Sequence, residues 1–252
     1  MCSSDLRPWW GWGPAGRGEP VDLRRLALAA LSAGCAWGGQ DEARLLPADR
    51  SAAVTYVALG DSTVEGVGAS SPELNYVSRI HARLRGVYPA ARLTNLGVGG
   101  ATSADVLLRQ LTRAIELRPY LVTISIGPND ITGRVPVKTY EKNLETILGR
   151  LTRETTAVVV ANLIPDLAVT PRFNRSGERD AVAAHTVRFN DALARRARAH
   201  GVQLVDLYAA SQREVPLRPE LIGSDGYHPS DAGYARWAEL LWEGVEARIA
   251  AR

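Results

Sequence analysis

The sequence predicts a single three-layer α/β domain, in which helices cover both faces of a parallel β-sheet. After residue 52, short apolar runs alternate five times with longer amphipathic segments, and this alternation is typical of parallel sheets. Hydrophobic residues make up 46% of the chain and charged residues 23%, as in globular proteins. A chain of 252 residues can hold one such domain together with a leader.

Strands are expected where a short apolar run can be buried on both faces of the sheet. In chain order these runs are Val54–Leu59, Arg92–Leu96, Leu121–Ile126, Ala157–Asn162 and Gln203–Asp206. Helices are expected where apolar residues recur about once per helical turn. These segments are Tyr76–Val87, Ser103–Leu117, Thr139–Arg153, Arg179–His200 and Asp231–Ala250. Because no internal repeat separates them, residues 52–252 are assigned to one domain.

The first 51 residues differ in composition from the rest and are assigned to an N-terminal leader. Four of the six tryptophans lie before residue 38, among glycines and prolines, where no periodic pattern would bury them. The opening Met1–Leu6 resembles a translated sequencing adapter, and a start at Val21 would bring a basic pair close to the N-terminus. Residues 41–51 are expected to be a linker.

An export signal is predicted between residues 21 and 35. Arg24 and Arg25 precede an apolar run and then small residues, which is the order of a secretory signal. The stretch Ser32-Ala33-Gly34-Cys35 also resembles a lipobox, in which the cysteine carries a lipid. We therefore expect a periplasmic or secreted protein, or one tethered to a membrane through Cys35. The alternative is a cytoplasmic protein with a disordered tail and a chance apolar stretch.

The composition argues against several classes of function. The formal net charge is only +3 and the basic residues are spread out, so no nucleic-acid partner is expected. No apolar run reaches the ~20 residues of a membrane span. The two cysteines, Cys2 and Cys35, precede the domain, and the four histidines are scattered. We therefore expect no disulfide framework, no metal and no cofactor in the domain.

Glycines and polar residues gather where the predicted strands end, which is the edge where parallel α/β sheets form their sites. The stretches are Gly60-Asp61-Ser62-Thr63, Gly97 to Thr102, Gly127-Pro128-Asn129-Asp130 and, later, Asp225-Gly226-Tyr227-His228-Pro229. A serine nucleophile requires a base and a carboxylate that orients it, and Ser62, His228 and Asp225 offer these groups. Gly100 and Asn129 offer N–H donors for an oxyanion.

Each of these residues also has an ordinary structural explanation. Ser62 could cap a helix, and glycine and asparagine are common in turns. The nucleophile elbow of α/β-hydrolases is not met, because Val64 stands where its last glycine would be. A dinucleotide loop is not met either, because Thr102 stands at the third glycine position.

In combination and in chain order, these residues resemble the SGNH, or GDSL-type, hydrolase family, which is named for the serine, glycine, asparagine and histidine. The resemblance covers residues 54 to 250. The family's first, second, third and fifth blocks are matched by Gly60-Asp61-Ser62, Asn95 to Thr102 with Gly100, Gly127-x-Asn129-Asp130 and Asp225-x-x-His228-Pro229. One departure is Thr63, which replaces the leucine of the GDSL tetrapeptide. The resemblance implies a flavodoxin-like sandwich with the strand order 2-1-3-4-5.

The resemblance and the chemistry of the residues together predict a serine hydrolase of carboxylic esters. Ser62 attacks the ester carbonyl, His228 removes the serine proton, and Asp225 fixes the imidazole tautomer. The backbone N–H groups of Ser62 and Gly100 and the side-chain amide of Asn129 hold the oxyanion. Esters of small or medium acyl groups are the expected substrates. Carbohydrate O-deacetylation, lysophospholipid or thioester cleavage, and a non-catalytic binding domain on the same scaffold are the alternatives.

Two further features surround this predicted site. Asp61 and Asp130 are expected to order the loops rather than to react. The stretch Ile164–Asp180 is long and lacks a periodic pattern, and such loops are usually functional or mobile. We expect it to border the acyl pocket, with Arg172 and Arg175 available to an anionic or sugar-bearing substrate.

Overall fold

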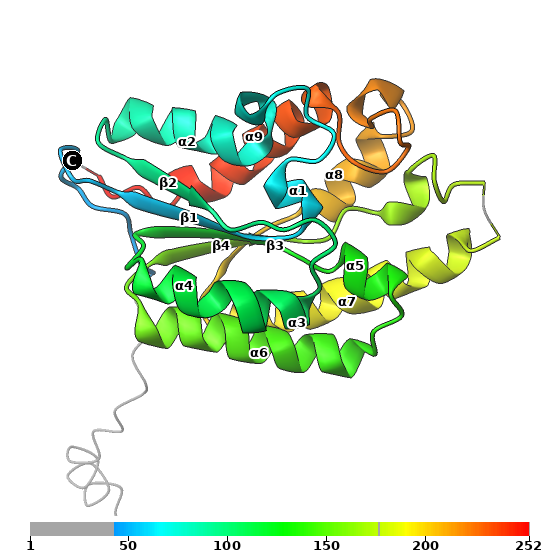
Figure 1. Cartoon of the computed structure of the whole chain (residues 1–252), viewed down its shortest axis with the longest axis horizontal. Helices are drawn as coiled ribbons and strands as arrows, with labels where there is room; N and C mark the ends of the chain where they lie inside the picture. The colour runs from blue at the N-terminus through cyan, green and yellow to red at the C-terminus, as the bar shows by residue number, and fades with distance from the viewer. Residues whose placement is uncertain (1–42, 176, 252) are drawn as a thin grey trace, which may run out of the picture. The chain divides into compact units, whose positions relative to one another are not determined.

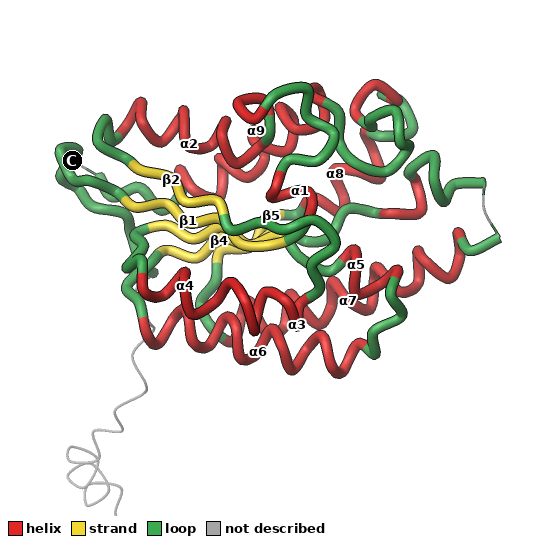
Figure 2. The backbone as a smooth tube through the Cα atoms, viewed as in Figure 1, coloured by secondary structure: helices red, strands yellow, loops and turns green. Residues whose placement is uncertain are grey.

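The structure, a computed structural model, describes residues 43–175 and 177–251. Five strands form one sheet in the order β2-β1-β3-β4-β5, and every pairing is parallel, which confirms the predicted fold. Figure 2 shows this sheet as the middle layer between helices. The strands are β1 (Thr55–Gly60), β2 (Arg92–Asn95), β3 (Leu121–Ser125), β4 (Val158–Asn162) and β5 (Gln203–Val205).

Two hydrophobic cores lie on the two faces of the sheet because successive strand residues point to opposite sides. Along β1, Val57 and Leu59 belong to one core and Tyr56 and Ala58 to the other. The first core packs under α4 (Leu111–Glu116), α6 (Val137–Glu154) and α7 (Arg179–Ala199), and the second under α2 (Tyr76–Val87) and α9 (Asp231–Glu246) (Figure 1).

The expected helix over 103–117 is interrupted. It begins as α3 (Ser103–Asp105), widens into a π-helical turn, η2 (Val106–Gln110), and continues as α4. A π-turn adds one residue and so changes which side chains face the sheet. Here it directs the buried side chain of Gln110 to the backbone of Gly60.

Six short elements were not expected because each is too short to show a periodic pattern. They are α1 (Ser62–Glu65), α5 (Pro128–Thr132) and α8 (Leu207–Glu214), and the 3₁₀ turns η1 (Pro72–Leu74), η3 (Leu167–Val169) and η4 (Pro219–Leu221). α1 and α5 begin directly after β1 and shortly after β3, so both helical starts lie at the carboxyl edge of the sheet.

The expected linker over 41–51 is wrong for its described part, because residues 43–51 pack on the domain. Leu46 is buried in the second core, and its N–H donates to the carbonyl of Arg248 at 2.7 Å. The guanidinium of Arg50 donates to the hydroxyl of Tyr88 and to the carbonyl of Ala250, both at 2.6 Å. The domain therefore begins before residue 52. For the same reason α9 ends at Glu246 rather than at Ala250, because the chain beyond it pairs with Leu46.

The predicted export signal and Cys35 lie outside the described residues, so both stay predictions. In the described ranges, no helix combines the length and the apolar composition that crossing a membrane requires.

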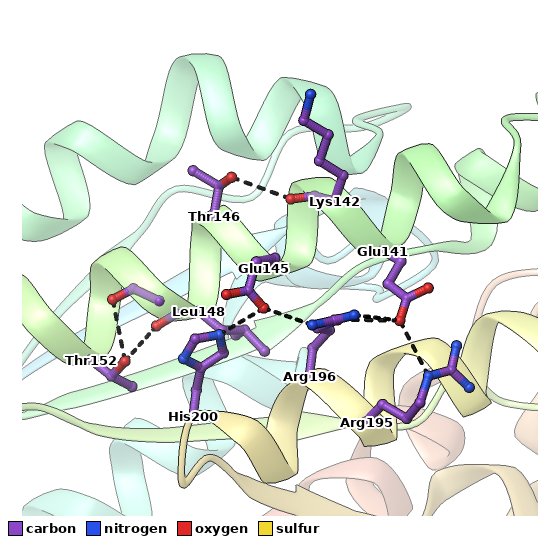
Figure 3. A network of polar contacts seen from close by, with 10 residues as sticks. Glu141, Lys142, Glu145, Thr146, Leu148, Thr152, Arg195, Arg196 and His200 are labelled. Carbon is purple, nitrogen blue, oxygen red and sulfur yellow. Dashed lines mark hydrogen bonds and ion pairs between the residues drawn. The ribbon is translucent and has the colours of Figure 1, made fainter.

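A network of charged residues joins α6 to α7 on the outer surface (Figure 3). Arg195 and Arg196 donate to Glu141 at 3.2 and 2.9 Å, and Arg196 also donates to Glu145 at 3.1 Å. His200, at the end of α7, lies 3.0 Å from Glu145. Because these groups are partly exposed, each pair contributes only about 0–1 kcal/mol. Together they fix how the two helices lie along each other.

The packing of residues 43–51 predicts where the chain can be shortened. Compared with a chain that lacks residues 1–42, a chain that lacks residues 1–51 should have a free energy of unfolding lower by at least about 2–5 kcal/mol, the usual cost of losing one buried leucine. Denaturant unfolding of both truncated chains measures this difference. Leu46→Ala, made in the chain that lacks only residues 1–42, is the control for the contribution of this leucine. Equal stability of the two truncations would contradict the packing.

Candidate active site

The turn that presents Ser62 is made by Gly60, the last residue of β1. Gly60 has a φ of +146°, and a Cβ at this position would lie 1.9 Å from the carbonyl oxygen of Ser125, so no other residue fits. Asp61 caps the helix that follows, because its Oδ1 accepts hydrogen bonds from the backbone N–H and the hydroxyl of Thr63, both at 2.9 Å. The cap is thus supplied by Asp61, and the hydroxyl of Ser62 is left for other contacts.

Ser62, His228 and Asp225 form a continuous chain of hydrogen bonds. The Oγ of Ser62 lies 2.9 Å from Nε2 of His228, and Nδ1 of His228 lies 2.5 Å from Oδ2 of Asp225. Because the carboxylate accepts from Nδ1–H, it leaves Nε2 unprotonated and facing the serine. The three residues predicted to form a catalytic triad are brought together in the order that nucleophilic catalysis requires.

The second carboxylate oxygen of Asp225 holds the loop itself. Oδ1 accepts from the backbone N–H groups of Tyr227 and His228, both at 2.9 Å. Burial by itself would raise the pKa of Asp225, but the hydrogen bonds from the His228 side chain and from these two N–H groups bring the pKa below its ordinary value. Asp225 is therefore ionised at neutral pH, as the partner of an imidazolium must be.

Three N–H donors follow the adjacent strands β1, β2 and β3, at the same edge of the sheet. Among the described residues, the backbone N–H groups of Ser62 and Gly100 have no acceptor. Gly100 has a φ of +78°, and no atom lies within 4 Å of the place where a Cβ would stand, so its backbone is open to a ligand. Asn129 donates one amide hydrogen to the carbonyl of Ala101 at 3.0 Å and keeps the other. This arrangement can stabilise a negatively charged oxygen.

Asp130 connects the two loops that carry these donors. Its carboxylate accepts from the N–H and the hydroxyl of Ser103, at 2.9 and 2.6 Å. The amide of Asn143 in turn donates to the same hydroxyl at 2.9 Å. Burial raises the pKa of Asp130, and these hydrogen bonds to Ser103 oppose that effect. Asp130 thus fixes the loop of Asn129 relative to the loop of Gly100.

Two positioning contacts, one made by Gln110 and one by Asn95, are not predicted by the sequence motifs. Gln110 accepts from the N–H of Gly60 at 2.9 Å and donates to its carbonyl at 2.8 Å, which holds the turn before Ser62. Asn95 donates to the carbonyl of Val64 at 2.7 Å and so ties the end of β2 to α1. The sequence does indicate that Gln110 is buried, because it lies four residues after the apolar Val106 and therefore on the same face of the expected helix over 103–117.

Asp61 is a second buried carboxylate, next to the serine. Its Oδ2 is buried and has no hydrogen-bond partner among the described residues. Burial raises the pKa of Asp61 to about 6, against the hydrogen bonds from Thr63 and the nearby charge of His228, which lower it. Above that pH the carboxylate carries a charge that is only partly compensated by its surroundings.

An apolar cavity of about 100 Å³ opens beside Ser62 and His228. Its walls come from the loop after β4 and from α8 and α9, and they include Leu167, Leu207, Trp237 and Leu240. The expectation that Ile164–Asp180 borders the pocket therefore holds for Pro165 to Thr170. Farther along, Phe173 is buried in the first core, whereas Arg175 is exposed.

Comparison with known proteins gives a consistent result. Residues 58–236 match the model of the GDSL-like Lipase/Acylhydrolase family. The GDSL-like esterase Rv1075c of Mycobacterium tuberculosis is 32% identical over 194 residues, which are 75% of this chain and 60% of that protein. The chain thus spans about 60% of the length of this relative. The acetylxylan esterase of Geobacillus stearothermophilus is 26% identical over 213 residues, 75% of this chain and 95% of the relative.

Among solved structures, an α/β hydrolase named LAE5, from the metagenome of Lake Arreo in Spain, has the same fold. It superposes with a TM-score of 0.65 at 24% sequence identity and covers 79% of this chain and 98% of its own.

The contacts of Asn129 predict how two substitutions should differ. Asn129→Ala removes an oxyanion donor and should lower kcat by ~10²–10³ with little change in KM. Asn129→Asp places negative charge near the oxyanion and an acceptor against the Ala101 carbonyl, so its kcat at pH 8 should be lower still. Rate measurements on both variants, with melting temperatures, test this. If Asn129 served only the turn, Asn129→Asp would be the more active variant, because aspartate suits turns better than alanine.

The buried charge of Asp61 predicts a pH-dependent stability. The pKa of the Asp61 carboxyl is about 6 in the folded protein and about 3.9 in the unfolded chain. Because the folded protein binds this proton more tightly, the free energy of unfolding should fall as pH rises between about 4 and 6. Asp61→Asn removes the charge and keeps an acceptor for Thr63. The melting temperature of this variant minus that of the unchanged protein should therefore be larger at pH 8 than at pH 4. The same difference at both pH values would show that the charge of Asp61 has no such cost.

Proposed function

The chain belongs to the GDSL-like lipase/acylhydrolase family, so its domain is a carboxylic ester hydrolase, and we propose that it cleaves esters of small or medium acyl groups through an acyl-serine on Ser62. The observation that carries this proposal is the hydrogen-bonded series from Ser62 through His228 to Asp225. A binding domain has no need of such a series, and for that reason we favour catalysis over the non-catalytic alternative.

Acylation begins when the ester carbonyl lies against Ser62. Nε2 of His228 accepts the hydroxyl proton as Oγ attacks the carbonyl carbon, and the carboxylate of Asp225 stabilises the imidazolium that forms. The developing oxyanion accepts from the N–H groups of Ser62 and Gly100 and from the free amide hydrogen of Asn129. His228 then gives its proton to the leaving alcohol, and the ester bond breaks.

Deacylation repeats these steps with water as the nucleophile. His228 removes a proton from water, the hydroxide attacks the acyl-serine, and the same three donors hold the second oxyanion. The proton then returns to Oγ of Ser62, and the acid leaves. No other group is needed to balance the reaction.

The size and polarity of the cavity support an acyl group of modest length. Its volume of about 100 Å³ is small, and the apolar side chains that line it include Leu167, Leu207 and Trp237. A second candidate within the same chemistry is the deacetylation of carbohydrates. It is supported by the 26% identity to an acetylxylan esterase over 75% of this chain.

A series of 4-nitrophenyl esters from acetate to palmitate tests this substrate range. The value of kcat/KM should be highest between acetate and hexanoate and at least tenfold lower for palmitate, because the cavity has no room for a long chain.

Leu167→Ala enlarges the cavity and should raise the octanoate-to-acetate ratio of kcat/KM. Ser62→Ala should lower kcat by roughly 10⁴–10⁶-fold on every ester. A preference for palmitate would contradict the assignment, and acetate release from acetylated xylan tests the second candidate.

We also propose that the chain is exported and tethered to a membrane by a lipid on Cys35, as the order of residues before Cys35 indicates. Expressed in a bacterium, the full chain should then fractionate with membranes, and Cys35→Ser should release it into the soluble fraction. Immunoblots of both fractions measure this. Release of the unmutated chain as a soluble exported protein would contradict lipidation but not export.

A further inference from the structure

A second, larger cleft lies between the segment after Asn129 and the start of α7. Its volume is about 570 Å³. The floor is apolar and includes Ile131, Phe173, Val182 and Phe189, all of which are buried in the first core. The proposed mechanism uses none of these residues.

Basic side chains dominate the rim of this cleft. Arg134, Arg172, Arg188 and His185 line it, and Glu178 is the one acidic residue among the described residues that do so. Glu178 lies 3.6 Å from Arg134, so part of its charge is already compensated there. Arg188 has no ion pair with any residue that the structure describes. The cleft therefore has a surplus of positive charge above an apolar floor.

Aromatic contacts connect this cleft to the catalytic imidazole. The guanidinium carbon of Arg172 lies 4.9 Å from the centre of the Tyr227 ring, and that ring packs edge-on against His228 at 5.0 Å. The backbone N–H of Arg172 donates to the carbonyl of Gly226 at 3.0 Å, within the loop that carries the triad. A substrate group held by Arg172 would thus lie one aromatic ring away from His228.

We propose that this cleft holds an anionic group of the ester substrate, a carboxylate or a phosphate, on Arg172 and Arg188. The inference rests on the proposed esterase function and narrows its substrates to esters that carry a negative charge away from the bond that breaks. Guanidinium groups suit this role because they bind carboxylate and phosphate oxygens in pairs. The apolar floor accommodates the carbon skeleton between the charge and the ester.

The test compares esters that differ only in charge. On the acyl side, mono-4-nitrophenyl adipate is compared with its methyl ester. On the alcohol side, O-acetylated glucuronic acid and O-acetylated glucose 6-phosphate are compared with O-acetylated glucose. The readout is the ratio of kcat/KM for the charged ester to that for the neutral one, in which any general effect on the triad cancels. The acyl-side and alcohol-side comparisons are the two arms of the test, and together they show on which side of the ester the anion lies. Within the alcohol arm, the glucuronic acid and glucose 6-phosphate esters distinguish a carboxylate from a phosphate.

In at least one arm, the unchanged protein should prefer the charged ester at least tenfold. Arg188→Gln and Arg172→Gln should each lower that ratio at least fivefold, and Arg188→Glu should lower it further. Arg85→Gln, on the exposed surface of α2, is the matched control and should leave the ratio unchanged. Raising NaCl from 20 to 500 mM should also lower the ratio, because salt screens charges at an exposed rim.

The outcomes separate this inference from the esterase function itself. Suppose that the neutral esters are hydrolysed. A charged-to-neutral ratio of kcat/KM near one in both arms would then overturn the anion site and leave the esterase function intact. A ratio that none of the arginine variants changes would have the same meaning. If the neutral esters were not hydrolysed at all, or were hydrolysed equally by Ser62→Ala, the proposed function itself would fail. An arginine-dependent preference in either arm would establish the site.

Discussion

The active site depends first on the turn at Gly60, where β1 ends and α1 begins. A side chain there would collide with the Ser125 carbonyl, and Gln110 holds both the N–H and the carbonyl of Gly60. This geometry leaves the backbone N–H of Ser62 without an acceptor among the described residues and its hydroxyl in contact with His228, while Asp61 caps the helix. A single backbone conformation therefore positions both the proposed nucleophile and one of the proposed oxyanion donors.

Side chains then fix the other loops relative to that turn. Asp130 ties the loop of Asn129 to the loop of Gly100 through Ser103. Ser70, just beyond α1, donates twice to Asp231, three residues after His228. Because these contacts exist without substrate, the proposed oxyanion donors would need little rearrangement during the proposed reaction, and such preorganisation is a main source of enzymatic rate enhancement. The cavity borders Ser62 and His228, and the basic cleft is connected to His228 through the contacts of Arg172 with Tyr227.

The sheet and the long helices could be predicted from the sequence because their periodic patterns extend over many residues. The parts that could not be predicted depend on contacts between distant segments or on single side chains. Nothing local shows that Leu46 packs beside Ile249, so residues 43–51 looked like a linker. Asp61 and Ser62 are equally good helix caps, and only the structure distinguishes them. The loop motifs indicated which residues meet, but not that Gln110 supports them.

Covalent labelling shows whether His228 activates Ser62 as a nucleophile, as we propose. The full chain is treated with a fluorophosphonate, which reacts with activated serines, and the modified peptide is identified by mass spectrometry. We expect one adduct per chain, on Ser62, that forms at least about 10³-fold more slowly in His228→Ala. An adduct on another serine, or labelling of Ser62 at an undiminished rate in His228→Ala, would contradict it.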